Sequence, residues 1–141
     1  MSEDGAAVDP PPVTARAIVA GHGDLAAGLV SAVAQITGRG EVLLPLSNRG
    51  MGGEQLEATL RATLDATGVR LVFTDLPGGS WTMAARRVLR SDPSLLLVTG
   101  VNLPMLLDWL GRDGEPTVGG ARGVAERGRS AILAAGGDGG D

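Results

Sequence analysis

Short apolar runs alternate with amphipathic segments of helical length along most of this 141-residue chain. The runs at 16–20, 41–46, 69–74 and 95–99 are each followed by a stretch in which apolar residues recur at helical spacing. Short apolar runs of this kind are typical of buried strands, and the intervening periodicity is typical of helices. The alternation predicts an α/β domain, an open doubly wound parallel sheet with helices on both faces.

The chain also carries signals for where these elements begin and end. Asp24 is expected to cap the first helix and Gly38 to end it. The last apolar run, Ser130 to Ala135, is expected to form a short strand. The further helices are expected over 54–66, 81–90, 103–110 and 118–128.

Composition indicates where the domain begins and ends and which classes of partner it argues against. Residues 1–12 are acidic and Pro-rich and are predicted to be a disordered tail, 13–135 one domain, and 136–141 a flexible tail. The net charge of −4, without a dense basic patch, argues against nucleic acid as a partner. With one His and no Cys, no metal site is expected. Because no apolar run approaches roughly 18 residues and the first residues lack an apolar core, we expect a cytoplasmic protein without direct membrane insertion.

The predicted topology indicates where a ligand would bind. In doubly wound sheets, ligands lie outside the carboxyl ends of the strands, where the strand order reverses. This rule selects the loops 21–23, 47–53 and 75–80. If the strand order is 2-1-3-4, the first and third strands flank that point, and His22 and Asp75 would face each other across one crevice.

His22 is the chain's only histidine, and it lies between two glycines that leave its ring uncovered. An Asp75 carboxylate that accepts a hydrogen bond from one ring nitrogen would make the other nitrogen a better nucleophile. Gly78, Gly79 and Ser80 precede a helix, so their N–H groups and hydroxyl could bind a phosphate. Plainer interpretations stay open: a surface histidine, a turn aspartate, and an ordinary loop with Ser80 as the helix cap.

Several sharper motifs fit the sequence poorly. Gly21 and Gly23 resemble a dinucleotide fingerprint, but Ala26 occupies the place of its third glycine. Ser80 is not in a nucleophile elbow, although a triad of Ser80, His22 and Asp75 could be assembled. A P-loop is excluded because the chain has no lysine.

Three motifs occur in order along the chain: Ile18-Val19-Ala20-Gly21-His22-Gly23, then Thr74-Asp75-Leu76-Pro77-Gly78-Gly79-Ser80, then Gly100-Val101-Asn102-Leu103-Pro104-Met105-Leu106. Each motif alone is weak, but their order and spacing together are specific. From about residue 13 to 135 the chain resembles the enzyme IIA domain of the mannose-family bacterial phosphotransferase system.

The resemblance implies a phosphoryl carrier. In that family the residue matching His22 accepts a phosphoryl group from the phosphocarrier HPr and passes it to an enzyme IIB component, which acts with membrane IIC and IID components in sugar uptake. The residue matching Asp75 pairs with it, the turn matching Gly78–Ser80 holds the phosphate, and no cofactor takes part. The family fold has the sheet order 2-1-3-4 with an added antiparallel edge strand, here 130–135, and usually forms homodimers, some of which exchange that strand.

Residues around the crevice are candidates for partner contact. Trp81 and Met51 are expected to contribute apolar surface, and Arg49, in a loop without a family counterpart, could reach the phosphate or be a solvated arginine. Three rival functions remain: a regulatory IIA-like protein without a transporter, a non-catalytic small-molecule binding module, and a hydrolase that uses Ser80.

Overall fold

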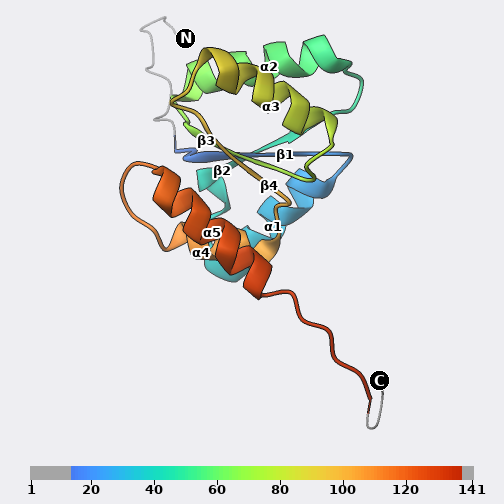
Figure 1. Ribbon diagram of the computed structural model, residues 1–141, viewed down its shortest axis with the longest axis vertical. Helices are drawn as coiled ribbons and strands as arrows, with labels where there is room; N and C mark the ends of the chain where they lie inside the picture. Colours follow the sequence, from blue (N-terminus) through green and yellow to red (C-terminus); the bar gives the residue numbers. More distant parts are fainter. Residues whose placement is uncertain (1–13, 138–141) are drawn as a thin grey trace, which may run out of the picture.

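The computed structural model describes residues 14–137 (Figure 1). The predicted tail 1–12 and residues 138–141 of the predicted C-terminal tail lie outside this range. The elements are β1 (Ala17–Gly21), α1 (Leu25–Thr37), the 3-10 helix η1 (Gly40–Val42), β2 (Leu43–Ser47), α2 (Gly53–Thr67), β3 (Leu71–Thr74), α3 (Ser80–Ser91), β4 (Leu96–Thr99), α4 (Leu103–Leu110) and α5 (Val118–Ser130).

The four strands form one parallel sheet with the order β2-β1-β3-β4, which confirms the predicted topology. In the centre of the sheet, Val19 of β1 pairs with Pro45 on one side and Phe73 on the other. Proline has no N–H to donate to a ladder, and β2 tolerates it because β2 is an edge strand. The chain adds β2 on one side of β1 and then β3 and β4 on the other, so the loops after β1 and β3 flank the point where the strand order reverses.

Side chains that alternate along each strand fill two separate cores. Ile18 and Ala20 point to the side covered by α2 and α3, whereas Ala17 and Val19 point to the side covered by α1, α4 and α5. Figure 1 shows these two helical layers on opposite faces of the sheet. Burial on both faces explains why β1 reads in the sequence as a continuous apolar run.

Helix α1 begins after Asp24 and ends at Gly38 as expected, but Asp24 does not cap it through its side chain. Gly38 has a φ of 74°, and its N–H donates to the carbonyl of Ala34, a left-handed helix end that suits glycine. Asp24 stands at the N-cap position, but its side chain makes no cap hydrogen bond. Its carboxylate is instead paired with Arg49, 2.7 Å away, so the predicted capping role is wrong.

The predicted edge strand over 130–135 is not present in the described chain. Ser130 is the last residue of α5, and residues 132–137 have no regular structure and run away from the domain (Figure 1). The 13 residues of α5 place Val124 in the core, and the helix continues through Ser130, the first residue of the predicted strand. Within residues 14–137, no helix is long and apolar enough to span a membrane.

Candidate functional site at the switch point

The three loops selected by the topology meet at the carboxyl ends of β1, β2 and β3. His22 directly follows β1, Asn48 follows β2, and Asp75 follows β3. The Oδ1 atom of Asn48 accepts a hydrogen bond of 3.1 Å from the N–H of Gly23, which fixes the loop that carries His22. Asn48 was not singled out in the sequence, although it lies in a loop that the topology rule selected.

His22 and Asp75 are in direct contact, as the topology predicted. The Nδ1 atom of His22 lies 2.6 Å from Oδ2 of Asp75, and the backbone N–H of His22 donates to the same oxygen at 2.9 Å. The other carboxylate oxygen accepts from the N–H of Leu76 at 3.0 Å. The carboxylate is nearly buried, with 5% of the side chain exposed, whereas 50% of the His22 side chain is exposed.

This contact determines which ring nitrogen of His22 is free. An ionised carboxylate only accepts hydrogen bonds, so Nδ1 carries the proton in the neutral ring and Nε2 keeps its lone pair. Among residues 14–137, no group hydrogen-bonds with Nε2. The ring therefore presents a nucleophilic nitrogen to solvent, and the contact between Nδ1 and Asp75 fixes its orientation.

The same contacts change the acidity of Asp75. Burial raises the pKa of its carboxyl group, but the hydrogen bonds from the His22 ring and backbone outweigh burial, so its pKa lies below the ordinary value of 3.8.

We expect this lowered pKa to make stability depend on pH. The pKa of Asp75 is lower in the folded protein than in the unfolded chain, so the unfolded chain binds more protons at pH values between the two. The stabilisation is complete well above 3.8 and is lost as the pH falls through the folded-state value. Thermal unfolding of the wild type and of Asp75→Asn, followed from pH 7 to pH 3, should show a wild-type advantage that shrinks below about pH 4. A constant difference between the two proteins would contradict this expectation.

A buried pair of threonines supports the loop that carries Asp75. The Thr82 hydroxyl, in the first turn of α3, lies 2.6 Å from the carbonyl oxygen of Leu76 and 2.7 Å from the hydroxyl of Thr74. Both threonines are fully buried. They tie the end of β3 to the start of α3 and hold the intervening turn, so the carboxylate stays directed at His22.

Gly79 lies where a side chain would disturb this arrangement. A Cβ atom there would stand 3.2 Å from Oδ1 of Asp75 and 3.2 Å from Cδ2 of Leu76, whereas one on Gly78 would meet nothing within 4 Å. We expect Gly79→Ala to lower the free energy of unfolding by about 1–3 kcal/mol, the usual effect of overpacking. Gly78→Ala is the matched control and should change it by less than about 0.5 kcal/mol. Equal effects in urea unfolding would contradict the proposed close packing.

The turn 78–80, which was predicted to bind a phosphate, leads into α3 but differs from the expectation in two respects. The helix cap is Gly79, and Ser80 is the first residue of α3, so Ser80 is not the cap. The N–H of Gly79 already donates to the carbonyl of Leu76 at 3.1 Å. The free donors are therefore the N–H groups of the first turn of α3, which have no partner within the helix.

Arg49 lies beside the loop that carries His22. Its guanidinium group pairs with Asp24, and one of its nitrogens would lie 3.8 Å from a Cβ on Gly23, next to His22. Both partners of this ion pair are largely exposed, 65% and 78%, so the pair contributes little to stability and can open readily.

The two predicted apolar contact residues have different surroundings. Trp81 is fully buried in the core under α2 and α3, so the prediction that it contacts a partner is wrong. Met51 is half-buried and packs against the same core. The exposed apolar side chains near the crevice are Leu25, Leu76 and Met83, each 44–45% exposed.

The rival chemistries find little support in this geometry. No hydrogen bond joins Ser80 to His22, whose Nδ1 faces Asp75, so a serine nucleophile activated by this histidine is not assembled. Within the described part of the chain, no group of three His, Asp or Glu side chains could hold a metal ion.

Comparison with known proteins gives the same class of fold. The mannose/sorbose-specific IIA subunit of the phosphotransferase system from Enterococcus faecalis is 26% identical, with a TM-score of 0.73 over 87% of this chain and 96% of that one. The phosphotransferase component EIIA from Streptococcus agalactiae is 22% identical, with a TM-score of 0.74 over 84% and 95%. A sigma-54 interaction domain protein from Enterococcus faecalis shares the fold at 13% identity, with a TM-score of 0.68 over 84% and 93%. No curated protein sequence gives a significant match.

The fold and the His22–Asp75 pair define a small doubly wound domain with a histidine at its switch point. The model of the EIIA-man family, PTS system fructose IIA component, matches residues 16–120. The chain belongs to this family of phosphotransferase-system IIA components.

Proposed function

We propose that this protein is a phosphoryl carrier in which His22 accepts a phosphoryl group from phospho-HPr and passes it to an enzyme IIB component. The observation that carries the proposal is the 2.6 Å contact between Nδ1 of His22 and Asp75, which leaves the lone pair of the neutral ring on Nε2 of a half-exposed side chain. Family membership supports the role in sugar transport.

Each of the two transfers, onto His22 and away from it, is an in-line displacement at phosphorus. The lone pair of Nε2 forms a bond to phosphorus while the bond between phosphorus and the HPr histidine breaks, and that histidine keeps the electron pair. His22 then carries a phosphoryl group, with its Nδ1 proton still held by Asp75. In the second step, an acceptor group on IIB attacks phosphorus, and the electron pair of the broken bond returns to Nε2. Because the group moves between nucleophiles of similar energy, no cofactor or metal is invoked.

The surroundings of His22 suit a negatively charged group. The N–H groups at the start of α3, in the turn Gly78–Ser80, adjoin Asp75 and provide donors together with the positive end of the helix dipole. We propose that the Arg49 guanidinium exchanges Asp24 for the phosphoryl oxygens after transfer. Such an exchange requires only the opening of an exposed ion pair.

Partner docking is proposed to use the apolar side chains that surround the crevice. Leu76 precedes α3, Met83 lies in its first turns, and Leu25 begins α1, so all three flank the loops that carry His22 and Asp75. Met51 adds a half-buried contact on the other side. HPr and IIB would occupy the same surface in turn, and IIB would connect the carrier to membrane IIC and IID components.

A regulatory role is a second candidate, favoured by one observation. The sigma-54 interaction domain protein from Enterococcus faecalis has the same fold, so this fold is not confined to transporter subunits. In such a role the phosphorylation state of His22 would be the signal, and no IIB would receive the group.

The transfer assay separates these functions. The protein, incubated with phosphoenolpyruvate, enzyme I and HPr, should gain one acid-labile phosphoryl group by intact mass. Adding the cognate IIB should remove that group under a transport role and leave it under a regulatory one. A small-molecule binding module would gain no phosphoryl group at all.

We also propose a homodimer built on the open edge of the sheet. Beyond β4 no further strand pairs within the described residues, and unpaired edges readily accept another strand. Ile132 and Leu133, 75% and 80% exposed, follow α5, which lies beside β4. In the dimer the segment after α5 of one protomer would pair with β4 of the other, the exchange that the family resemblance implies.

Charged residues in this segment should break the dimer. We expect the double substitution Ile132→Asp with Leu133→Asp to convert a dimer into a folded monomer in analytical ultracentrifugation, because buried unpaired carboxylates disfavour the interface. Ile36→Asp, at a residue of α1 that is 58% exposed, is the control and should stay dimeric. A monomeric wild type, or a doubly substituted protein that remains dimeric, would contradict the proposal.

A further inference from the structure

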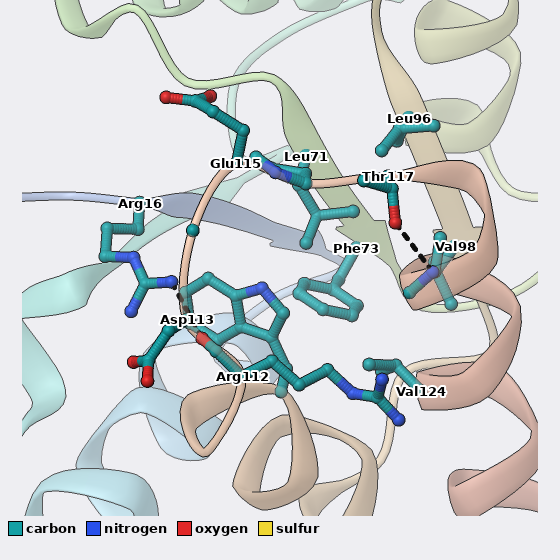
Figure 2. A pocket seen from close by; sticks show the side chains of 15 residues that line it. Arg16, Leu71, Phe73, Leu96, Val98, Arg112, Asp113, Glu115, Thr117 and Val124 are labelled. Carbon is teal, nitrogen blue, oxygen red and sulfur yellow. Dashed lines mark hydrogen bonds between the residues drawn. The ribbon is translucent and has the colours of Figure 1, made fainter.

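A cavity lies at the opposite end of the strands from His22 (Figure 2). Arg16 immediately precedes β1, and Leu71 and Leu96 are the first residues of β3 and β4, so the cavity opens at the amino ends of the strands. The loop 111–117 between α4 and α5 and the first turns of α5 close it. Its volume is about 190 Å³, and none of its lining residues belongs to the His22 site.

The inner wall of this cavity is apolar and partly aromatic. Phe73 and Trp109 meet edge to face, with their ring centres 6.0 Å apart and their planes at 77°. Val98 and Val124 complete the wall (Figure 2). An apolar cavity of roughly 150 Å³ accommodates benzene, and drug-sized ligands need roughly 300 Å³ or more. The space therefore suits a single ring or a branched aliphatic group.

The rim of the cavity carries charges of both signs. The Arg16 guanidinium lies over the Trp109 ring, 4.9 Å from its centre, and donates one hydrogen bond, of 3.1 Å, to the carbonyl of Arg112. Within residues 14–137 its other donors have no partner. Asp113 and Glu115 stand on the closing loop without an ion pair in the described part of the chain. Arg112 is paired with Asp108, so Arg16 is the cation available to a ligand.

A more polar cavity of about 160 Å³ adjoins the first. The two share Arg16, Trp109 and Glu115, so an apolar space and a polar space meet at one cation and one carboxylate. A ligand that spans the junction would place a charged end in the polar space and a hydrocarbon end against Phe73 and Trp109.

We propose that this double cavity binds a small zwitterion with an apolar side chain, which is the chemistry of an aromatic or branched-chain amino acid. The ligand carboxylate pairs with Arg16, its ammonium group with Glu115 or Asp113, and its side chain fills the space lined by Phe73, Trp109 and Val124. A sugar would leave its hydroxyls without partners against the apolar wall. A nucleotide would exceed the volume and meet two carboxylates.

Nuclear magnetic resonance of the full chain tests the proposal independently of phosphoryl transfer. The two tryptophans give separate indole N–H signals, Trp109 in the cavity wall and Trp81 in the core on the other face of the sheet. The probes are L-phenylalanine, 3-phenylpropionate, which lacks the ammonium group, and 2-phenylethylamine, which lacks the carboxylate. We expect L-phenylalanine to shift the Trp109 signal saturably, to leave that of Trp81 unchanged, and to bind more tightly than either analogue.

Two variants locate the site. Arg16→Gln should weaken L-phenylalanine binding at least about tenfold, the effect of losing one charge-assisted contact. Ala121→Leu should abolish binding by filling the apolar space. Arg86→Gln, an exposed arginine on α3, is the control and should bind as the wild type does. No saturable shift of Trp109 with L-phenylalanine, equal binding of either analogue, or unchanged binding by both variants would overturn the proposal.

Discussion

Replacing His22 with alanine is expected to abolish phosphoryl incorporation while leaving the domain folded. The substitution removes the proposed nucleophile, and we expect the rate of transfer from phospho-HPr to fall by at least about 10⁴-fold. Half of the His22 side chain is exposed and it fills no core space, so its loss leaves no cavity. Intact mass after incubation with phosphoenolpyruvate, enzyme I and HPr measures the loss.

This variant separates the proposed function from its rivals. A hydrolase that uses Ser80 would instead lose activity in Ser80→Ala and react with serine-directed reagents. A binding module would keep its function in His22→Ala. Phosphoryl incorporation by His22→Ala at the wild-type rate would contradict the assignment of the nucleophile.

The second large effect is expected for Asp75→Asn. The amide can still accept a hydrogen bond, but it carries no charge and can turn its NH₂ group toward Nδ1, which favours the ring tautomer with the proton on Nε2. The substitution also removes the negative charge that would balance the positive charge of the phosphorylated ring. We expect transfer to slow by roughly 10²–10³-fold, since a comparable change in a serine-protease triad lowers kcat by about 10⁴. Rapid-quench measurement of transfer from phospho-HPr gives this rate.

Asp24→Asn is the matched control for that experiment. Asp24 lies near His22 in the sequence, and its carboxylate is exposed and paired with Arg49 rather than with the ring. The substitution releases Arg49, which is proposed to leave Asp24 after transfer in any case, so it should change the transfer rate by less than about threefold. Equal losses in the two variants would show that the net charge of the crevice matters and that orientation of the ring by Asp75 does not.

Sequence reasoning predicted the sheet because its signals are local and repeated. Each buried strand is a short apolar run, and the glycine at position 38 ends a helix through its left-handed backbone. Once the order 2-1-3-4 is assumed, the carboxyl ends of β1 and β3 are neighbours, and the contact between His22 and Asp75 follows from topology alone.

The features that the sequence did not predict depend on packing between segments that are far apart in the chain. Trp81 closely follows the exposed residues 76–78, yet it is fully buried in the core that α2 and α3 form over the sheet, and no local pattern reveals that burial. The apolar residues after Ser130 look like a strand, yet a strand needs a partner, and in one protomer α5 continues through Ser130 instead. The cavity beneath Arg16 joins positions 16, 73 and 109, which only the tertiary structure brings together.

Hydrogen bonds between residues that are separated in the chain also support the site, and the sequence did not predict them. Asn48 and Thr82 hold the loops that carry His22 and Asp75 through hydrogen bonds across 25 and 6–8 residues of sequence. Asparagine and threonine are common in loops and helix starts, so neither residue type signals such a role. Only the measured distances identify them as positioning residues.

In the proposed function, His22 accepts the phosphoryl group through Nε2. The most direct test is phosphorus–proton correlation spectroscopy of the wild type after incubation with phosphoenolpyruvate, enzyme I and HPr. We expect one phosphoryl group, bonded to Nε2 of His22, with Nδ1 still protonated against Asp75. A phosphoryl group on Nδ1 or on another residue, or no incorporation with a cognate HPr, would contradict it.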